Sequence, residues 1–183
     1  KEIKAIVLTS SDPKNFCLGV DIGWMMKAQQ AQDFTGISKW LYDMGEVFKA
    51  MIMSPVPTIA AINGHAFGNG AMLAGACDFR FMRADRGFFC FPEIDLGIQF
   101  APSMIEWMKK AMPYHLFIRM KWSGEKVGAA ELEKHNVIIK ACADAEETVK
   151  EAVAFAKTFN KSRNTLAEFK RRTYKHILDI MEK

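Results

Sequence analysis

Residues 57–98, which read PTIAAINGHAFGNGAMLAGACDFRFMRADRGFFCFPEIDLGI, decide the fold of this chain. Within them, Thr58–Ile62 is a short apolar run between a proline and an Asn-Gly turn signal, which predicts a buried strand. Residues 79–83 and 88–91 alternate in the manner of strands on either side of a turn. This stretch therefore predicts three strands.

Three glycines, Gly64, Gly68 and Gly70, lie between the first of these strands and the apolar run 71–77. That order predicts a tight turn followed by the start of a buried helix. Strands that alternate with helices indicate an α/β fold.

The flanking segments continue the alternation. Residues 3–9 (IKAIVLT) predict a buried strand, and residues 38–53 predict an amphipathic helix that Pro55 ends. Residues 23–37 are expected to form a loop. Further on we expect two short helices over residues 104–112 and 114–121 and a strand over residues 137–140. The capping signature of Asp144 and Glu147 predicts a helix over residues 145–159, and a final helix is expected over residues 166–180.

The bulk composition fits one domain with a sizeable core, since the chain has 183 residues of which 50% are hydrophobic. Its four cysteines lie far apart, with no pairing typical of a zinc site or a disulfide framework, so we expect no metal. No stretch approaches the roughly 20 apolar residues that span a bilayer, so we expect no membrane partner.

The net charge of +4 comes from the C-terminal end, where residues 161–183 hold 7 basic and 3 acidic side chains. This basic segment is read either as a solvated helix face or as attraction to a phosphorylated ligand or an acidic surface. It lacks a nucleic-acid recognition motif, so a nucleic-acid partner is not expected.

Two glycine-containing segments follow predicted strands: Leu18-Gly19-Val20-Asp21 after the first, and residues 66–70 after the second. In a parallel sheet the ends of two such strands can lie side by side, so backbone N–H groups from both loops could meet at one small anion. Neither loop alone matches a phosphate-binding consensus.

Together the segments 3–9, 15–22 (NFCLGVDI) and 57–98 resemble the enoyl-CoA hydratase/isomerase, or crotonase, superfamily. The resemblance implies a ClpP/crotonase-like ββα spiral core over residues 1–120 and a C-terminal helical trimerisation region over residues 121–183. It also implies an acyl-CoA thioester as substrate, no separate cofactor because coenzyme A is part of the substrate, and a homotrimer or hexamer.

The resemblance further implies an oxyanion hole made by the backbone N–H groups of Val20 and Asn69. Family members mostly carry glycine at the position of Asn69. Of the two glutamates that the family's hydratases use, one falls at Glu93 and is present, whereas the other falls at Met72. A single base suffices to move a 3,4 double bond to the 2,3 position, so the chain is most similar to the Δ3,Δ2-enoyl-CoA isomerases.

Other residues are expected around the substrate. The resemblance implies contacts with the acyl-CoA for Leu18, Gly19, Asp21, Gly68, Gly70, Met72, Lys170 and Arg171, the last two toward its phosphates. Asp21 is also expected to cap the following helix. Trp24, Met25, Met26, Phe67 and Met72 are candidates for an acyl-chain pocket, or else plain core.

Three alternatives stay open beside the isomerase: an enoyl-CoA hydratase, another acyl-CoA lyase or hydrolase that uses Glu93 alone, and a non-catalytic acyl-CoA-binding module. Relatives carry a strand-rich segment before residue 3, so we expect a fragment, a processed form or a shortened variant. The compartment is expected to be the cytoplasm of a bacterium, or otherwise the mitochondrial or peroxisomal matrix, with no targeting signal visible.

Overall fold

The computed structural model describes residues 2–182 and contains two four-stranded sheets. The first sheet is entirely parallel, in the order β1-β3-β5-β8. Its strands are β1 (Ile6–Leu8), β3 (Thr58–Ile62), β5 (Phe79–Arg83) and β8 (Lys140–Cys142). The second sheet has the order β2-β4-β6-β7, with only the last pair antiparallel. Its strands are β2 (Asn15–Cys17), β4 (His65–Phe67), β6 (Phe89–Cys90) and β7 (Lys126–Val127).

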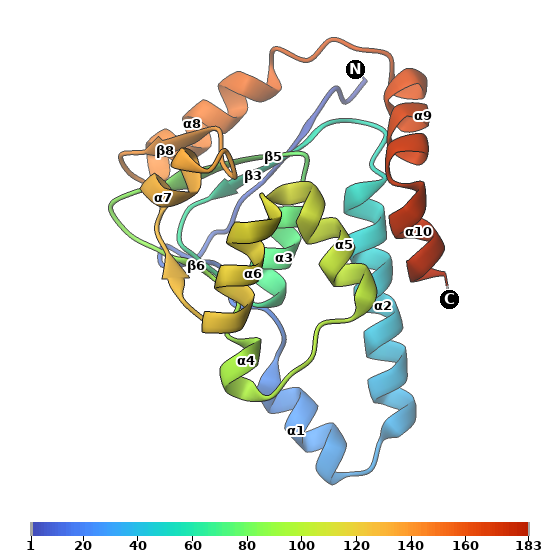
Figure 1. The fold of residues 1–183 in the computed structure, drawn as a ribbon. Helices are drawn as coiled ribbons and strands as arrows, with labels where there is room; N and C mark the ends of the chain where they lie inside the picture. The colour runs from blue at the N-terminus through green and yellow to red at the C-terminus, as the bar shows by residue number, and fades with distance from the viewer. Residues whose placement is uncertain (1, 183) are drawn as a thin grey trace.

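The helices surround these sheets (Figure 1). They are α1 (Ile22–Gln30), α2 (Phe34–Ile52), α3 (Asn69–Ala76), α4 (Glu93–Leu96), α5 (Pro102–Ala111), α6 (Tyr114–Ser123), α7 (Ala129–Lys134), α8 (Ala145–Ala156), α9 (Arg163–Thr173) and α10 (Lys175–Met181). Helix α3 lies in the middle of the molecule and packs against α2 and α5, whereas α1 and one end of α2 extend away from the rest (Figure 1). In residues 2–182 we find no helix whose length and apolarity would let it cross a membrane.

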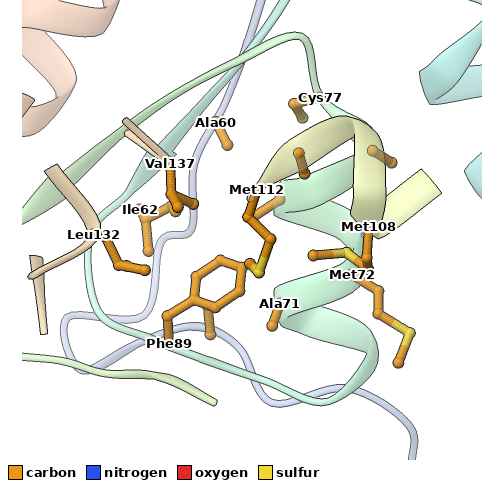
Figure 2. Packing of buried hydrophobic residues seen from close by; sticks show 14 of the residues in the cluster. Ala60, Ile62, Ala71, Met72, Cys77, Phe89, Met108, Met112, Leu132 and Val137 are labelled. Carbon is orange, nitrogen blue, oxygen red and sulfur yellow. The ribbon is translucent and has the colours of Figure 1, made fainter. Parts of the chain in front are cut away.

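Strand β3 is buried along its whole length because both faces of the first sheet are covered. Ile59 and Ala61 pack into a cluster with residues of α8, while Ala60 and Ile62 pack into the larger core that includes α3. Figure 2 shows Ala60 and Ile62 in this larger core. Burial on both sides explains why the strand reads as a continuous apolar run rather than an alternating one.

The predicted strands 58–62 and 79–83 are confirmed with those bounds. The predicted strand 137–140 is wrong in position, because β8 begins at Lys140. Val137 and Ile138 are buried beside the sheet without pairing in it. The expected loop 23–37 is also wrong: α1 occupies most of it and α2 begins at Phe34, each behind a capping aspartate.

The single final helix expected over residues 166–180 is two helices, with Tyr174 between α9 and α10. The capping signature at Asp144 is confirmed, since its side chain accepts a hydrogen bond from the Glu147 N–H at 2.8 Å. The larger core contains residues from before and after residue 120 in the sequence. The division into a core region over residues 1–120 and a helical region over residues 121–183 stays a prediction.

Candidate active site

The two glycine loops lie against each other. A Cβ on Gly19, whose φ is +92°, would lie 3.1 Å from the Asn69 nitrogen and 3.0 Å from the Phe67 carbonyl oxygen. A Cβ on Gly70 would collide with the Cys17 carbonyl group. Glycine is therefore required on both loops for this approach.

The strands that bring the loops together differ from those predicted. Residues 18–21 follow β2 and residues 68–70 follow β4, which are parallel neighbours in the second sheet. The predicted strands 3–9 and 58–62 pair in the first sheet instead. The expectation that the two loops converge is confirmed, but the strands assigned to them were wrong.

Two backbone donors in this contact have no partner. Among the hydrogen bonds of residues 2–182, neither the Val20 N–H nor the Asn69 N–H has a protein acceptor. Asn69 opens α3, and the first amides of a helix have no acceptor within it. The N-terminal end of a helix also favours negative charge. Each of the two loops thus offers an unpaired backbone donor to an anion.

Glu93 stands next to this contact. It opens α4, is only 8% exposed, and its Oε1 lies 3.2 Å from the position of a Cβ on Gly68. Its Oε2 is buried with no hydrogen-bond partner in the described part of the chain. Burial raises the pKa of Glu93, because the charged form loses hydration that its own backbone N–H only partly replaces. A raised pKa suits a group that must take up and release a proton near neutral pH.

Met72 lies one turn into α3 and is 1% exposed, within the larger core (Figure 2). Its side chain cannot hold a water or move a proton. Asp95 lies on the exposed side of α4. Within the site, Glu93 is the carboxyl group that touches the glycine loop.

A cavity of about 340 Å³ opens beside the two loops. Its wall comes largely from apolar side chains of α2, and the full lining is Cys17, Gly19, Val20, Asp21, Trp40, Asp43, Met44, Val47, Phe48, Asn69 and Leu73. The Asn69 side chain faces this cavity and donates from Nδ2 to the Met44 sulfur at 2.6 Å.

Sequence reasoning missed the α2 residues of this wall. Met44, Val47 and Phe48 share the helical stripe that reads as ordinary core, so their pattern carries no separate signal for a cavity. None of the five residues considered for an acyl-chain pocket, Trp24, Met25, Met26, Phe67 and Met72, lines it.

The other predicted contact residues divide into two groups. Near the loops, Leu18 is 57% exposed and Asp21 caps α1 by accepting a hydrogen bond from the Trp24 N–H at 2.9 Å. Lys170 does not join them: its Nζ donates to Asp78 at 2.6 Å and it lines a different cavity. Arg171 pairs on the surface with Glu168 of its own helix. Contact of these two cations with coenzyme A phosphates stays a prediction.

Comparisons with known proteins give matches to enoyl-CoA hydratases and isomerases. A family model described as enoyl-CoA hydratase/isomerase matches residues 1–181. The chain is 34% identical over 151 residues to the peroxisomal enoyl-CoA delta isomerase 2 of Arabidopsis thaliana and 32% identical over 154 residues to enoyl-CoA delta isomerase 3 of the same plant. These matches cover 79% and 81% of this chain, which spans 61% and 62% of the two relatives. A crotonyl-CoA hydratase of Syntrophomonas wolfei is 36% identical over 98 residues, which are 52% of this chain and 35% of that protein.

Solved structures show the same fold. A probable enoyl-CoA hydratase from Mycobacterium tuberculosis superposes with a TM-score of 0.84 over 97% of this chain and 73% of its own, at 21% identity. The crotonase-like α/β fold expected from the sequence is confirmed. With a matching family model over nearly every residue and isomerases above 30% identity, this chain belongs to the enoyl-CoA hydratase/isomerase family.

Proposed function

We propose that this protein is an isomerase that shifts the double bond of a 3-enoyl-CoA to give the 2-trans-enoyl-CoA, a step of fatty-acid β-oxidation. One observation carries the proposal: the buried carboxyl group of Glu93 has an unpaired oxygen and touches Gly68, directly beside the unpaired N–H of Asn69. Two relatives named as enoyl-CoA delta isomerases support the same class of reaction.

In the proposed mechanism the thioester carbonyl oxygen accepts hydrogen bonds from the Val20 and Asn69 N–H groups. The Glu93 carboxylate removes a proton from C2, and the electron pair moves onto the carbonyl oxygen to form a dienolate. Glu93 returns the proton to C4, which moves the double bond from C3–C4 to C2–C3. A preorganised donor at such an oxygen is worth about 2.7–4 kcal/mol, because negative charge develops there in the transition state.

Met72 favours isomerisation over hydration. Hydration needs a positioned water in addition to a proton donor, and Met72 stands where the resemblance places the second glutamate of the hydratases. Its apolar side chain is packed in the core and offers no hydrogen bond to a water.

The remaining features of the proposal follow from the family. Coenzyme A enters as part of the substrate, without a separate cofactor, and the active assembly is a homotrimer or hexamer. The Arabidopsis relative is named peroxisomal, which is compatible with an organelle matrix and does not fix the compartment of this chain.

The test is turnover of a 3-enoyl-CoA by the purified protein, with and without Glu93→Gln. We expect the substitution to lower kcat by about 100-fold or more, as loss of a general acid/base does, while acyl-CoA still binds. Asp95→Asn on the exposed side of α4 is the matched control and should keep full activity. Isomerisation that survives Glu93→Gln would overturn the mechanism.

The same preparation separates the alternatives. Hydration of a 2-enoyl-CoA faster than isomerisation would favour a hydratase. Acyl-CoA binding without turnover in either assay would favour the non-catalytic module.

A further inference from the structure

The C-terminal end of α3 is held by two basic side chains from other elements. Lys110 of α5 donates from Nζ to the carbonyl oxygens of residues 75–77, at 3.1, 3.2 and 2.9 Å in chain order. Arg80 of β5 donates from Nη1 to Ala74 at 3.4 Å and to Cys77 at 2.8 Å. All four carbonyl groups at this end therefore have a side-chain donor from Lys110 or Arg80.

These donors replace the usual helix ending. The last carbonyl groups of a helix have no partner within it, and water or a left-handed glycine commonly serves them. Here the C-cap is Cys77, in extended conformation and 0% exposed. Arg80 is buried too, and it has a further bond to the Val137 carbonyl at 2.7 Å. The end of α3 is thus fixed to α5 and to the first sheet through Lys110 and Arg80.

The same short helix carries the candidate oxyanion donor at its other end. Its eight residues, Asn69–Ala76, span about 12 Å at 1.5 Å per residue. Close packing holds its side, because a Cβ on Gly75 would come within 2.5 Å of the Met108 sulfur of α5. Figure 2 shows Met108 beside α3. Residues 74–77 and Asn69 belong to the same short, closely packed helix, so a shift of one end along the helix axis displaces the other end as well.

We propose that Lys110, together with Arg80, is a positioning residue that fixes α3 along its axis and so keeps the Asn69 N–H aligned with the Val20 N–H. The inference rests on the proposed function, which takes these two amides as the oxyanion donors. Catalytic groups must be held within about 0.5 Å of their productive geometry, and a misplacement of about 1 Å costs on the order of 100-fold in rate.

The competing explanation is that the two basic side chains only stabilise the fold by pairing buried carbonyl groups. Loss of stability alone lowers Tm and leaves kcat unchanged in the folded protein. Loss of position lowers kcat and leaves KM nearly unchanged, because the oxyanion donors act most strongly in the transition state.

The experiment compares Lys110→Met, Lys110→Arg and the control Ile177→Ala. Ile177 of α10 is 0% exposed and belongs to the same core, but its apolar side chain makes no hydrogen bond to α3. Tm, kcat and KM are measured with a 3-enoyl-CoA at a temperature where all variants are folded. We expect Lys110→Met to lower kcat roughly tenfold or more with KM within about twofold, and Lys110→Arg to recover most of it. Ile177→Ala should lower Tm without this loss of kcat.

A kcat for Lys110→Met within about twofold of the original protein would overturn the inference, as would an equal loss in Ile177→Ala. Lys110→Gln, whose shorter side chain cannot reach the three carbonyl groups together, replaces Lys110→Met if the latter does not fold, with the same criteria.

Absence of isomerisation in the original protein would instead count against the proposed function. The positioning is then judged without turnover, by hydrogen exchange of the backbone amides of residues 72–76. Faster exchange in Lys110→Met than in Ile177→Ala supports the inference, and equal exchange overturns it.

Discussion

Gly68 and Glu93 are in direct contact: the Oε1 atom of Glu93 lies 3.2 Å from the position that a Cβ on Gly68 would take. Gly68 also has a φ of +53°, a value that residues other than glycine rarely adopt. The contact joins the glycine loop after β4 to the start of α4, and so places the carboxyl group next to the Asn69 amide.

Gly68→Ala should therefore lose both stability and activity. Strain at positive φ costs about 1–2 kcal/mol, and the new methyl group would displace the Glu93 carboxyl group. Gly97→Ala is the control, since Gly97 also has a positive φ, +67°, but nothing lies within 4 Å of its Cβ position. Denaturant unfolding should show a loss of stability for both variants, larger for Gly68→Ala, and isomerase assays should show a loss for Gly68→Ala alone. If Gly68→Ala and Gly97→Ala had equal isomerase activity, the contact between Gly68 and Glu93 would have no role in catalysis.

Glu93→Gln should raise the stability of the protein at neutral pH. Because burial raises the pKa of Glu93, the folded protein binds more protons than the unfolded chain between the ordinary and the raised pKa. Stability therefore falls as pH rises through that window, and glutamine removes this cost. Below the ordinary glutamate pKa of about 4.3 the two proteins should converge. Tm measured from pH 4 to pH 8 checks this.

Glu147→Gln provides the control of opposite sign. The hydrogen bond from Lys140 lowers the pKa of Glu147, so its charged form stabilises the folded protein above the ordinary pKa. Glutamine there should lower Tm at neutral pH and have little effect in acid. A gain in Tm for both variants would refute the assignment of the Glu93 effect to burial.

Asn69→Gly should widen the cavity beside the two glycine loops. The substitution removes the carboxamide that contacts the Met44 sulfur and keeps the backbone N–H. We expect kcat/KM to rise for longer or bulkier acyl chains relative to short ones. Met44→Leu is the control, because it removes the sulfur acceptor at nearly constant volume and should leave this preference unchanged. An unaltered chain-length profile for Asn69→Gly would exclude Asn69 as a determinant of cavity size.

Lys170→Met should destabilise the protein strongly. Its side chain is 5% exposed and that of its partner Asp78 is 12% exposed, so the change leaves a buried carboxylate without its cation. Breaking a buried pair in this way typically costs about 3–5 kcal/mol. Arg171→Met on the exposed face of α9 should change stability little. Unfolding in denaturant measures the difference, and acyl-CoA titration of Arg171→Met tests its predicted contact with the coenzyme.

The sequence alone predicted the parts of the molecule that local chemistry specifies. Strand β3 is an apolar run bounded by turn signals and β5 alternates before a turn, so their bounds follow from pattern. The cap at Asp21 likewise depends on neighbouring backbone, whereas glycine is needed at Gly19 and Gly70 because two loops distant in the chain approach each other. Glu93 was identified by resemblance, and the structure adds its burial and its unpaired oxygen.

Tertiary structure decided what depends on distant partners. β4 has only three residues and exists through pairing with β2 and β6, so no pattern of its own predicts it. The partner of Lys170 lies 92 positions earlier in the chain, so no local pattern predicts this buried ion pair. Lys110 has the same basic character as any surface lysine. Only the packing of α5 against α3 brings it to the carbonyl groups that it holds, because long-range packing selects hydrogen-bond partners that local sequence cannot specify.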